Sequence, residues 1–138
     1  MAVWNVIDHQ VVGSGGLPVG GWEKTSISQD YDHLCLMAAI RSDKSGVGSA
    51  WLRVQVGDGS LDTGSNYSYT YLYTGTGTPS CYYNNGHESW RYNMINPDGG
   101  YGFSVNWMWI PHYTNTDRHK QFIARNANTI ASGLDNEA

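Results

Sequence analysis

A stretch of regular alternation between residues 101 and 110 constrains this chain more than any other feature of its sequence. Its large side chains occupy one parity, at Tyr101, Phe103, Val105, Trp107 and Trp109. Successive side chains of a β-strand point to opposite faces of a sheet, so a period of two predicts a half-buried strand whose large side chains share one face. Pro111 ends the predicted strand, because proline has no N–H to donate to a neighbouring strand.

Similar patterns predict further strands. Residues 31–42 are apolar on both parities, which is typical of a central strand that is buried on both faces. Strands are also predicted at residues 51–56, 67–74 and 89–95. Turn-forming sequences such as Asn84-Asn85-Gly86 separate them. Short strands joined by tight turns predict an all-β fold, namely an antiparallel β-sandwich that is jelly-roll-like, with little or no helix.

The ends of the chain are less regular than its middle. Val3–Val12 fits a strand or an extended arm, and Trp22–Ile27 fits another strand. Asp117–Ile130 fits either a short helix or an edge strand. The chain has 138 residues, which suffices for one domain. The predicted organisation is an N-terminal strand or arm with a glycine-rich loop at 1–21, a β-sandwich domain at 22–131 and a polar tail at 132–138.

Charge and hydropathy argue against two classes of partner. The chain has eight lysines and arginines and a net charge of −4, which disfavours binding to a nucleic-acid backbone. Its longest apolar run, Leu34–Ile40, is far shorter than the roughly 20 residues of a membrane-spanning helix. The N-terminus lacks the basic and apolar regions of a signal peptide, so we expect the chain to fold where it is synthesised. Cys35 and Cys81 are expected to be free thiols, and whether they pair stays open.

No pattern of catalytic or metal-binding residues emerges. The five histidines form no ligand pair at metal-site spacing, and the chain has no nucleophile elbow and no phosphate-binding loop. Asp58 and Asp62 begin a partial calcium loop, but Thr63 stands where that loop needs glycine and Tyr69 where it needs glutamate. An ordinary hairpin connection is the preferred interpretation, and these two aspartates remain the candidates for a looser calcium site. The sequence therefore predicts a protein without enzymatic activity, catalytic residues or cofactors.

The chain is rich in aromatic residues, with ten tyrosines, six tryptophans and two phenylalanines. These exceed the usual needs of a small sandwich core, and exposed aromatic side chains are typical of binding surfaces. Trp51, Trp90 and Tyr92 are the predicted exposed binding residues, because they cannot all point inward if their neighbours do. The alternating tyrosines from Tyr67 to Tyr73 are predicted instead to pave one face of a sheet, where cross-strand pairs stabilise the fold.

Three segments resemble a family of small virion proteins that is abundant in tailed bacteriophages. They are Thr25–Leu34 with its continuation to Arg41-Ser42-Asp43, Asp62–Tyr69, and Phe103–Thr116 together with Lys120. These turn-and-strand signatures cover most of residues 22–125 and are more specific for fold than for function. The chain departs from the family pattern at Ser28, where proline is expected, and in a lengthened loop at 57–61.

The resemblance implies a jelly-roll-like β-sandwich on the virion surface, made in the host cytoplasm, without catalytic residues. The implied function is that of a capsid decoration, or cement, protein that stabilises the head by bridging major capsid subunits. The alternative is a tail-fibre or receptor-binding module that binds carbohydrate. The implied partners are the major capsid protein and further copies of this chain, with a glycan as the partner in the alternative. Relatives continue with further strands beyond residue 138, so we expect a neighbouring copy or the capsid to cover an open sheet edge.

Overall fold

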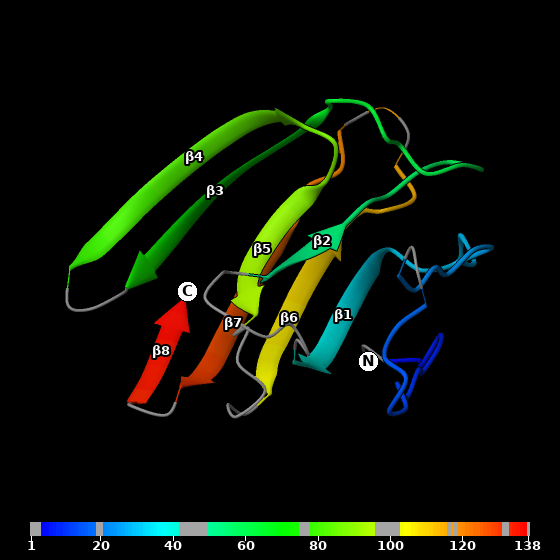
Figure 1. The fold of residues 1–138 in the computed structure, drawn as a ribbon. Helices are drawn as coiled ribbons and strands as arrows, with labels where there is room; N and C mark the ends of the chain where they lie inside the picture. The colour runs from blue at the N-terminus through cyan, green and yellow to red at the C-terminus, as the bar shows by residue number, and fades with distance from the viewer. Residues whose placement is uncertain are drawn as a thin grey trace. The chain divides into compact units, whose positions relative to one another are not determined.

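The structure, a computed structural model, describes most of the chain. Contacts between its residues divide it into two units, Met1–Tyr31 and Asp32–Ala138, so this boundary lies beyond the predicted one at residue 21. The secondary structure of the described part consists of β-strands, with no helix (Figure 1). The described residues are 4–18, 21–41, 50–74, 78–95, 103–115, 117, 119–130 and 133–137.

The first unit contains turns and extended chain. Its contacts include a hydrogen bond from the Gly16 N–H to the Gly13 carbonyl and an ion pair of 3.3 Å between Lys24 and Asp8. The predicted strands at Val3–Val12 and Trp22–Ile27 are wrong over the described residues of these ranges. A lone strand leaves its backbone groups without a ladder, and no neighbouring strand pairs with these segments in the described part. Large apolar side chains of this unit are exposed, namely Trp4, Val6, Ile7, Val11, Val12, Leu17 and Trp22.

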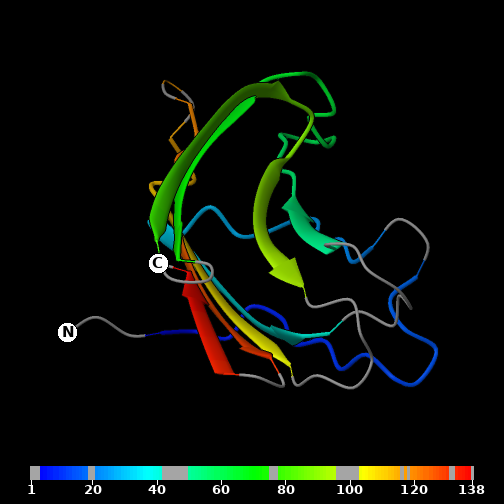
Figure 2. The same cartoon turned by 60° about the vertical axis from the view of Figure 1, so that its left-hand side comes forward.

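The second unit contains two antiparallel sheets. One has six strands in the order β1-β6-β7-β8-β3-β4, and the other pairs β2 with β5. The predicted all-β antiparallel class is thereby confirmed, while the sandwich and its jelly-roll connectivity stay predictions. Figure 2 shows β2 and β5 facing the concave side of the long, curved β3 and β4. The strands are β1 (His33–Ile40), β2 (Ala50–Val54), β3 (Tyr67–Thr74), β4 (Pro79–His87), β5 (Trp90–Ile95), β6 (Ser104–Pro111), β7 (Ile123–Ile130) and β8 (Gly133–Glu137).

Four strands differ from the sequence predictions or decide between alternatives that the sequence left open. β1 lies at the edge of its sheet rather than at its centre, because among the described strands it pairs with β6 alone. Residues 123–130 form a strand that lies between β6 and β8, which excludes the helix and the edge position for this part of 117–130. Residues 133–137, predicted as a polar tail, form β8. The predicted turn at 84–86 is a bulge within β4, where Gly86 adopts a φ of 68°.

The large side chains of β6 share one face, as predicted, but the buried face is the other one. Ser104, Asn106, Met108 and Ile110 are buried, whereas the large side chains of the other parity are exposed or half-buried. The buried Asn106 amide donates hydrogen bonds to the carbonyls of Ser104 and Ala38, so its burial leaves the donor satisfied.

The packing of the core explains why the side chains of Ser104, Asn106, Met108 and Ile110, rather than the larger ones, are buried. Met108 and Ile110 pack against apolar side chains that the other strands and loops contribute, so the inner face of β6 needs no aromatic residue of its own. These packed residues are Leu34, Leu36, Leu52, Val54, Tyr113, Phe122 and Ala124. Trp90 is also buried, at 5% exposure, which corrects the prediction that it is exposed. Its ring packs against Tyr67 and Phe122, at centroid distances of 5.4 and 4.4 Å.

Candidate binding surfaces

The outer face of β1, β6 and β7 carries the large apolar side chains that the core leaves out. Residues directly opposite each other in an antiparallel pair lie on the same face, so the register defines three rows. We call this surface the outer apolar face. Its rows are Cys35–Trp109–Ile123, Met37–Trp107–Arg125 and Ala39–Val105–Ala127.

Solvent reaches much of the outer apolar face. Met37, Val105 and Ile123 are 73%, 59% and 61% exposed. The indoles of Trp107 and Trp109 are half-buried and nearly parallel, with centroids 6.3 Å apart and planes inclined by 19°. A shallow hollow of about 340 Å³ opens beside Met37 and Trp107. Exposed apolar area of this kind is typical of surfaces that contact other macromolecules.

The charges at this surface are all positive. β1, β6 and β7 contain no aspartate or glutamate, and Arg125 is their one residue with a permanent charge. Beyond the end of β1, the Arg41 guanidinium lies over the ring of Phe103, 5.3 Å from its centroid. Burial raises the pKa of the Cys35 thiol, an effect that a hydrogen bond with Trp107 partly opposes. The face therefore combines exposed apolar area with the positive charge of Arg125.

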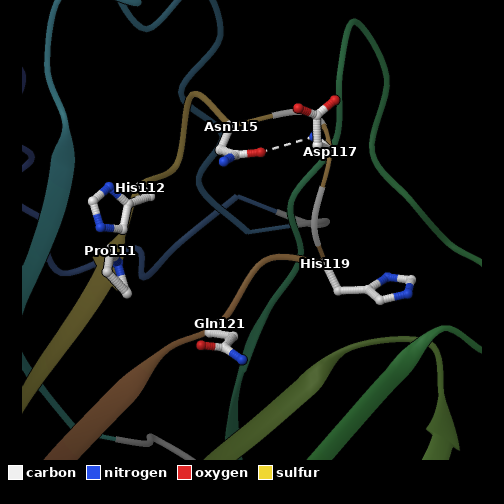
Figure 3. Close-up of a pocket in the computed structure, with 6 residues that line it drawn as sticks. All are labelled: Pro111, His112, Asn115, Asp117, His119 and Gln121. Atoms are coloured by element: carbon white, nitrogen blue, oxygen red, sulfur yellow. Dashed lines mark hydrogen bonds between the residues drawn. The ribbon is translucent and has the colours of Figure 1, made fainter.

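A second candidate site is a pocket in the loop between β6 and β7 (Figure 3). It has a volume of about 550 Å³ and is lined by Pro111, His112, Asn115, Asp117, His119 and Gln121. The backbone N–H of Asp117 donates to the side-chain oxygen of Asn115 at 2.8 Å. Figure 3 shows the imidazoles of His112 and His119 on opposite sides of the pocket. The lining can hydrogen-bond a small polar ligand.

His33 holds this loop in place from β1. Its Nδ1 accepts a hydrogen bond of 3.0 Å from the backbone N–H of His112, whose φ of 47° is unusual for a residue other than glycine. The His33 ring lies 4.9 Å from Trp109 and 4.8 Å from His112 between centroids. Sequence reasoning missed this corner because 79 positions separate the two histidines. No group of three or more His, Cys, Asp or Glu side chains in the described part of the chain is arranged to hold a metal ion.

A row of aromatic rings on the inner side of the β3–β4 hairpin forms a third surface. Tyr71 is its centre, with Tyr82 at 5.2 Å, Tyr73 at 5.6 Å and Trp51 at 6.0 Å between ring centroids. Tyr82 is 45% exposed, and its hydroxyl accepts a hydrogen bond from the Asn84 amide. The tyrosines of β3 therefore pave one sheet face and also extend to solvent at the hairpin.

The predicted binding residues are not brought together as one site. Trp51 is half-buried and belongs to this aromatic row, whereas Trp90 is enclosed in the core. Tyr92 lies in β5, and its side chain is outside what the structure describes. Among the three predicted binding residues, Trp51 is therefore the one whose described side chain belongs to the aromatic row.

The aspartates that were candidates for a calcium site lie in the β2–β3 loop. The Asp62 carboxylate accepts hydrogen bonds from the Gly64 N–H at 2.9 Å and from the Asn66 amide. Asp58 is exposed in the same loop. Asp62 therefore stabilises the loop between β2 and β3. These strands belong to different sheets, so the predicted hairpin connection is wrong.

No protein-family profile matches the chain, and neither a curated protein nor a solved structure is significantly similar to it. Within the described residues, no helix is both long and apolar enough to cross a membrane.

Proposed function

We propose that this protein is a non-enzymatic structural component of a phage particle, a decoration protein that stabilises the capsid by bridging major capsid subunits. The observation that carries the proposal is the outer apolar face on β1, β6 and β7. A phage origin rests on the resemblance of its turn-and-strand segments to small virion proteins. The geometry supports the adhesive part of the proposal, because the face offers exposed apolar contact area.

The energetics of the face favour many weak contacts over one strong contact. Complete burial of a Val, Ile or Met side chain contributes roughly 1.5–3 kcal/mol. Met37, Val105 and Ile123 together then contribute at most about 4.5–9 kcal/mol, whereas association costs roughly 4–15 kcal/mol in lost motional freedom. One face therefore binds weakly even with help from the two indoles. Copies arrayed on a symmetric shell overcome this weakness, because neighbouring attachments raise the effective concentration.

Quantitative mass spectrometry of purified virions is the test of this proposal. We expect hundreds of copies per particle, as a shell component requires. A few copies, or a few tens, would place the protein in the tail and contradict decoration. Absence from the particle would overturn every virion role.

A variant directs the same test to the outer apolar face. Ile123→Glu places a carboxylate at a position that is 61% exposed in the free chain but buried in the proposed contact. We expect at least a tenfold loss of binding to undecorated capsids, measured by cosedimentation. Tyr83→Glu is the control, because Tyr83 is 62% exposed on β4, outside the face. Equal binding by both variants would exclude this face as the contact.

Carbohydrate binding is the second candidate function, and the aromatic row around Tyr71 favours it. Sugar rings stack on aromatic faces, and the Asn84 amide beside the Tyr82 hydroxyl supplies polar groups for orientation. Tyr82→Ala is expected to abolish binding on a glycan array. Tyr83→Ala is the matched control, because Tyr83 lies next in the chain on the opposite face of β4. Binding that survives Tyr82→Ala would exclude the row.

A further inference from the structure

The two edges of the six-stranded sheet are built differently. β4 begins at Pro79, and a bulge at Asn85 and Gly86 interrupts its pairing with β3. Proline and bulges are devices that protect an edge from pairing with another chain. β1 has neither device over its eight residues, and its register with β6 runs without a shift. One edge of the sheet is therefore protected, and the other, β1, lacks these devices and has no second strand neighbour within the described residues.

The composition of β1 makes its open edge suited to pairing. It contains no proline and no lysine, arginine, aspartate or glutamate, the residues that normally keep an edge in solvent. Within the described part of the chain, β6 is its one strand neighbour. Met37 is 73% exposed at the middle of the strand. A long apolar edge of this kind is a template for another strand.

We propose that β1 pairs antiparallel with β1 of a second copy, so that two six-stranded sheets join across a two-fold axis. This dimer goes beyond the proposed function, because it forms between purified chains without a capsid. In the dimer the outer apolar faces of the two copies meet along β1 and form one continuous apolar surface.

Charge and symmetry favour a second copy as the occupant. Asp32 precedes β1 and Arg41 follows it, so antiparallel pairing brings opposite charges of the two copies to the same end of the joint. β1 itself has no permanent charge, so self-pairing sets no like charges opposite each other. A two-fold contact also uses the same patch on both chains, which is the commonest symmetry of soluble oligomers.

The small area of the β1–β1 contact determines the affinity of the dimer. Pairing of two eight-residue strands buries less than the roughly 1,600 Å² of a standard stable interface. We therefore expect a dissociation constant in the micromolar range, with a dimer that dissociates on dilution. On a capsid, the high local concentration would keep the pair together.

Sedimentation analysis over a range of concentrations tests the dimer. The wild-type mass is expected to rise from the chain mass of 15.3 kDa towards twice that value. Met37→Lys introduces the type of residue that protects natural edges, at an exposed position, and should weaken dimerisation at least tenfold. Tyr83→Lys on the opposite edge is the matched control and should dimerise like the wild type. A second variant, Ala39→Lys, also lies exposed on β1 and replaces Met37→Lys if circular dichroism shows that the first is unfolded.

Three outcomes would overturn the inference. A wild-type chain that stays monomeric at millimolar concentration excludes the pairing. Dimers of unchanged strength in the folded β1 variant exclude this edge, and equal loss in Tyr83→Lys places the contact elsewhere. Ile123→Glu separates the two proposals, because it leaves the β1 edge intact and should retain the dimer while losing capsid binding. A monomeric wild type that still binds capsids would leave only the decoration proposal standing.

Discussion

At the scale of single residues, Tyr67 ties the β2–β3 loop to the core. Its hydroxyl accepts a hydrogen bond from the Val56 N–H at 3.1 Å and lies within donating distance of the carbonyls of Val56 and Asp62, at 3.0 and 2.9 Å. The side chain is 4% exposed. Removing this hydroxyl takes a partner from the part-buried Val56 N–H and Asp62 carbonyl, whereas the Val56 carbonyl keeps its hydrogen bond from the Asp62 N–H. The loss of partly buried partners costs more than the net contribution of one hydrogen bond.

We expect Tyr67→Phe to lower the free energy of unfolding by about 1–3 kcal/mol. Urea denaturation followed by tryptophan fluorescence measures the change. Tyr83→Phe is the control, because its exposed position predicts a change within about 0.5 kcal/mol. Equal stabilities of the two variants would show that the hydroxyl does not hold the loop.

The same residue gives the protein a pH dependence at alkaline pH. Burial raises the pKa of Tyr67 above its ordinary value of 10.0; a backbone hydrogen bond with Val56 opposes the rise, and the nearby Asp62 charge adds to it. Since the folded pKa exceeds the unfolded one, the contribution to stability is fully present below about pH 10 and is lost as the pH rises through the folded pKa. The difference in stability between wild type and Tyr67→Phe should therefore shrink above pH 10. A difference that does not change with pH would contradict this linkage.

At the scale of elements, β6 shows that alternation locates a strand without deciding its buried face. Its larger aromatic side chains lie on the outer face of the sheet, because Met108 and Ile110 already fill the space opposite β2 and the loop residues. The tryptophans of β6 therefore belong to the outer apolar face. The same reasoning explains β1, whose two apolar faces serve the core on one side and this surface on the other.

Paired truncations on β6 test which parity is buried. Met108→Ala is expected to cost about 2–5 kcal/mol, because Met108 is 0% exposed and its loss leaves a cavity. Val105→Ala is expected to change stability by no more than about 0.5 kcal/mol, because that side chain is 59% exposed. Thermal or urea unfolding of the two variants measures both effects. The opposite ranking would show that the aromatic face is the one in the core.

At the scale of the whole molecule, two adjacent features of the second unit have separable roles. The outer apolar face is made of side chains on β1, β6 and β7, whereas the open edge is made of the backbone of β1. A change to Ile123 alters the face alone, whereas a lysine at Met37 alters both features, because Met37 lies on the face and on the edge strand. We therefore expect Ile123→Glu to weaken capsid binding and retain the dimer, and Met37→Lys to weaken both.

The sequence by itself determined where most strands lie and that they form an antiparallel all-β fold. Periods of two and turn-forming residues are local, so they located strands at 33–40, 67–74 and 104–111 within a few positions. Only the tertiary structure decided which face of β6 is buried, that β1 is an edge and that Trp90 is in the core. It also brought His33 and His112, which are 79 positions apart in the sequence, into hydrogen-bond contact. These outcomes depend on which distant strands pair and pack together, and no local pattern carries that information.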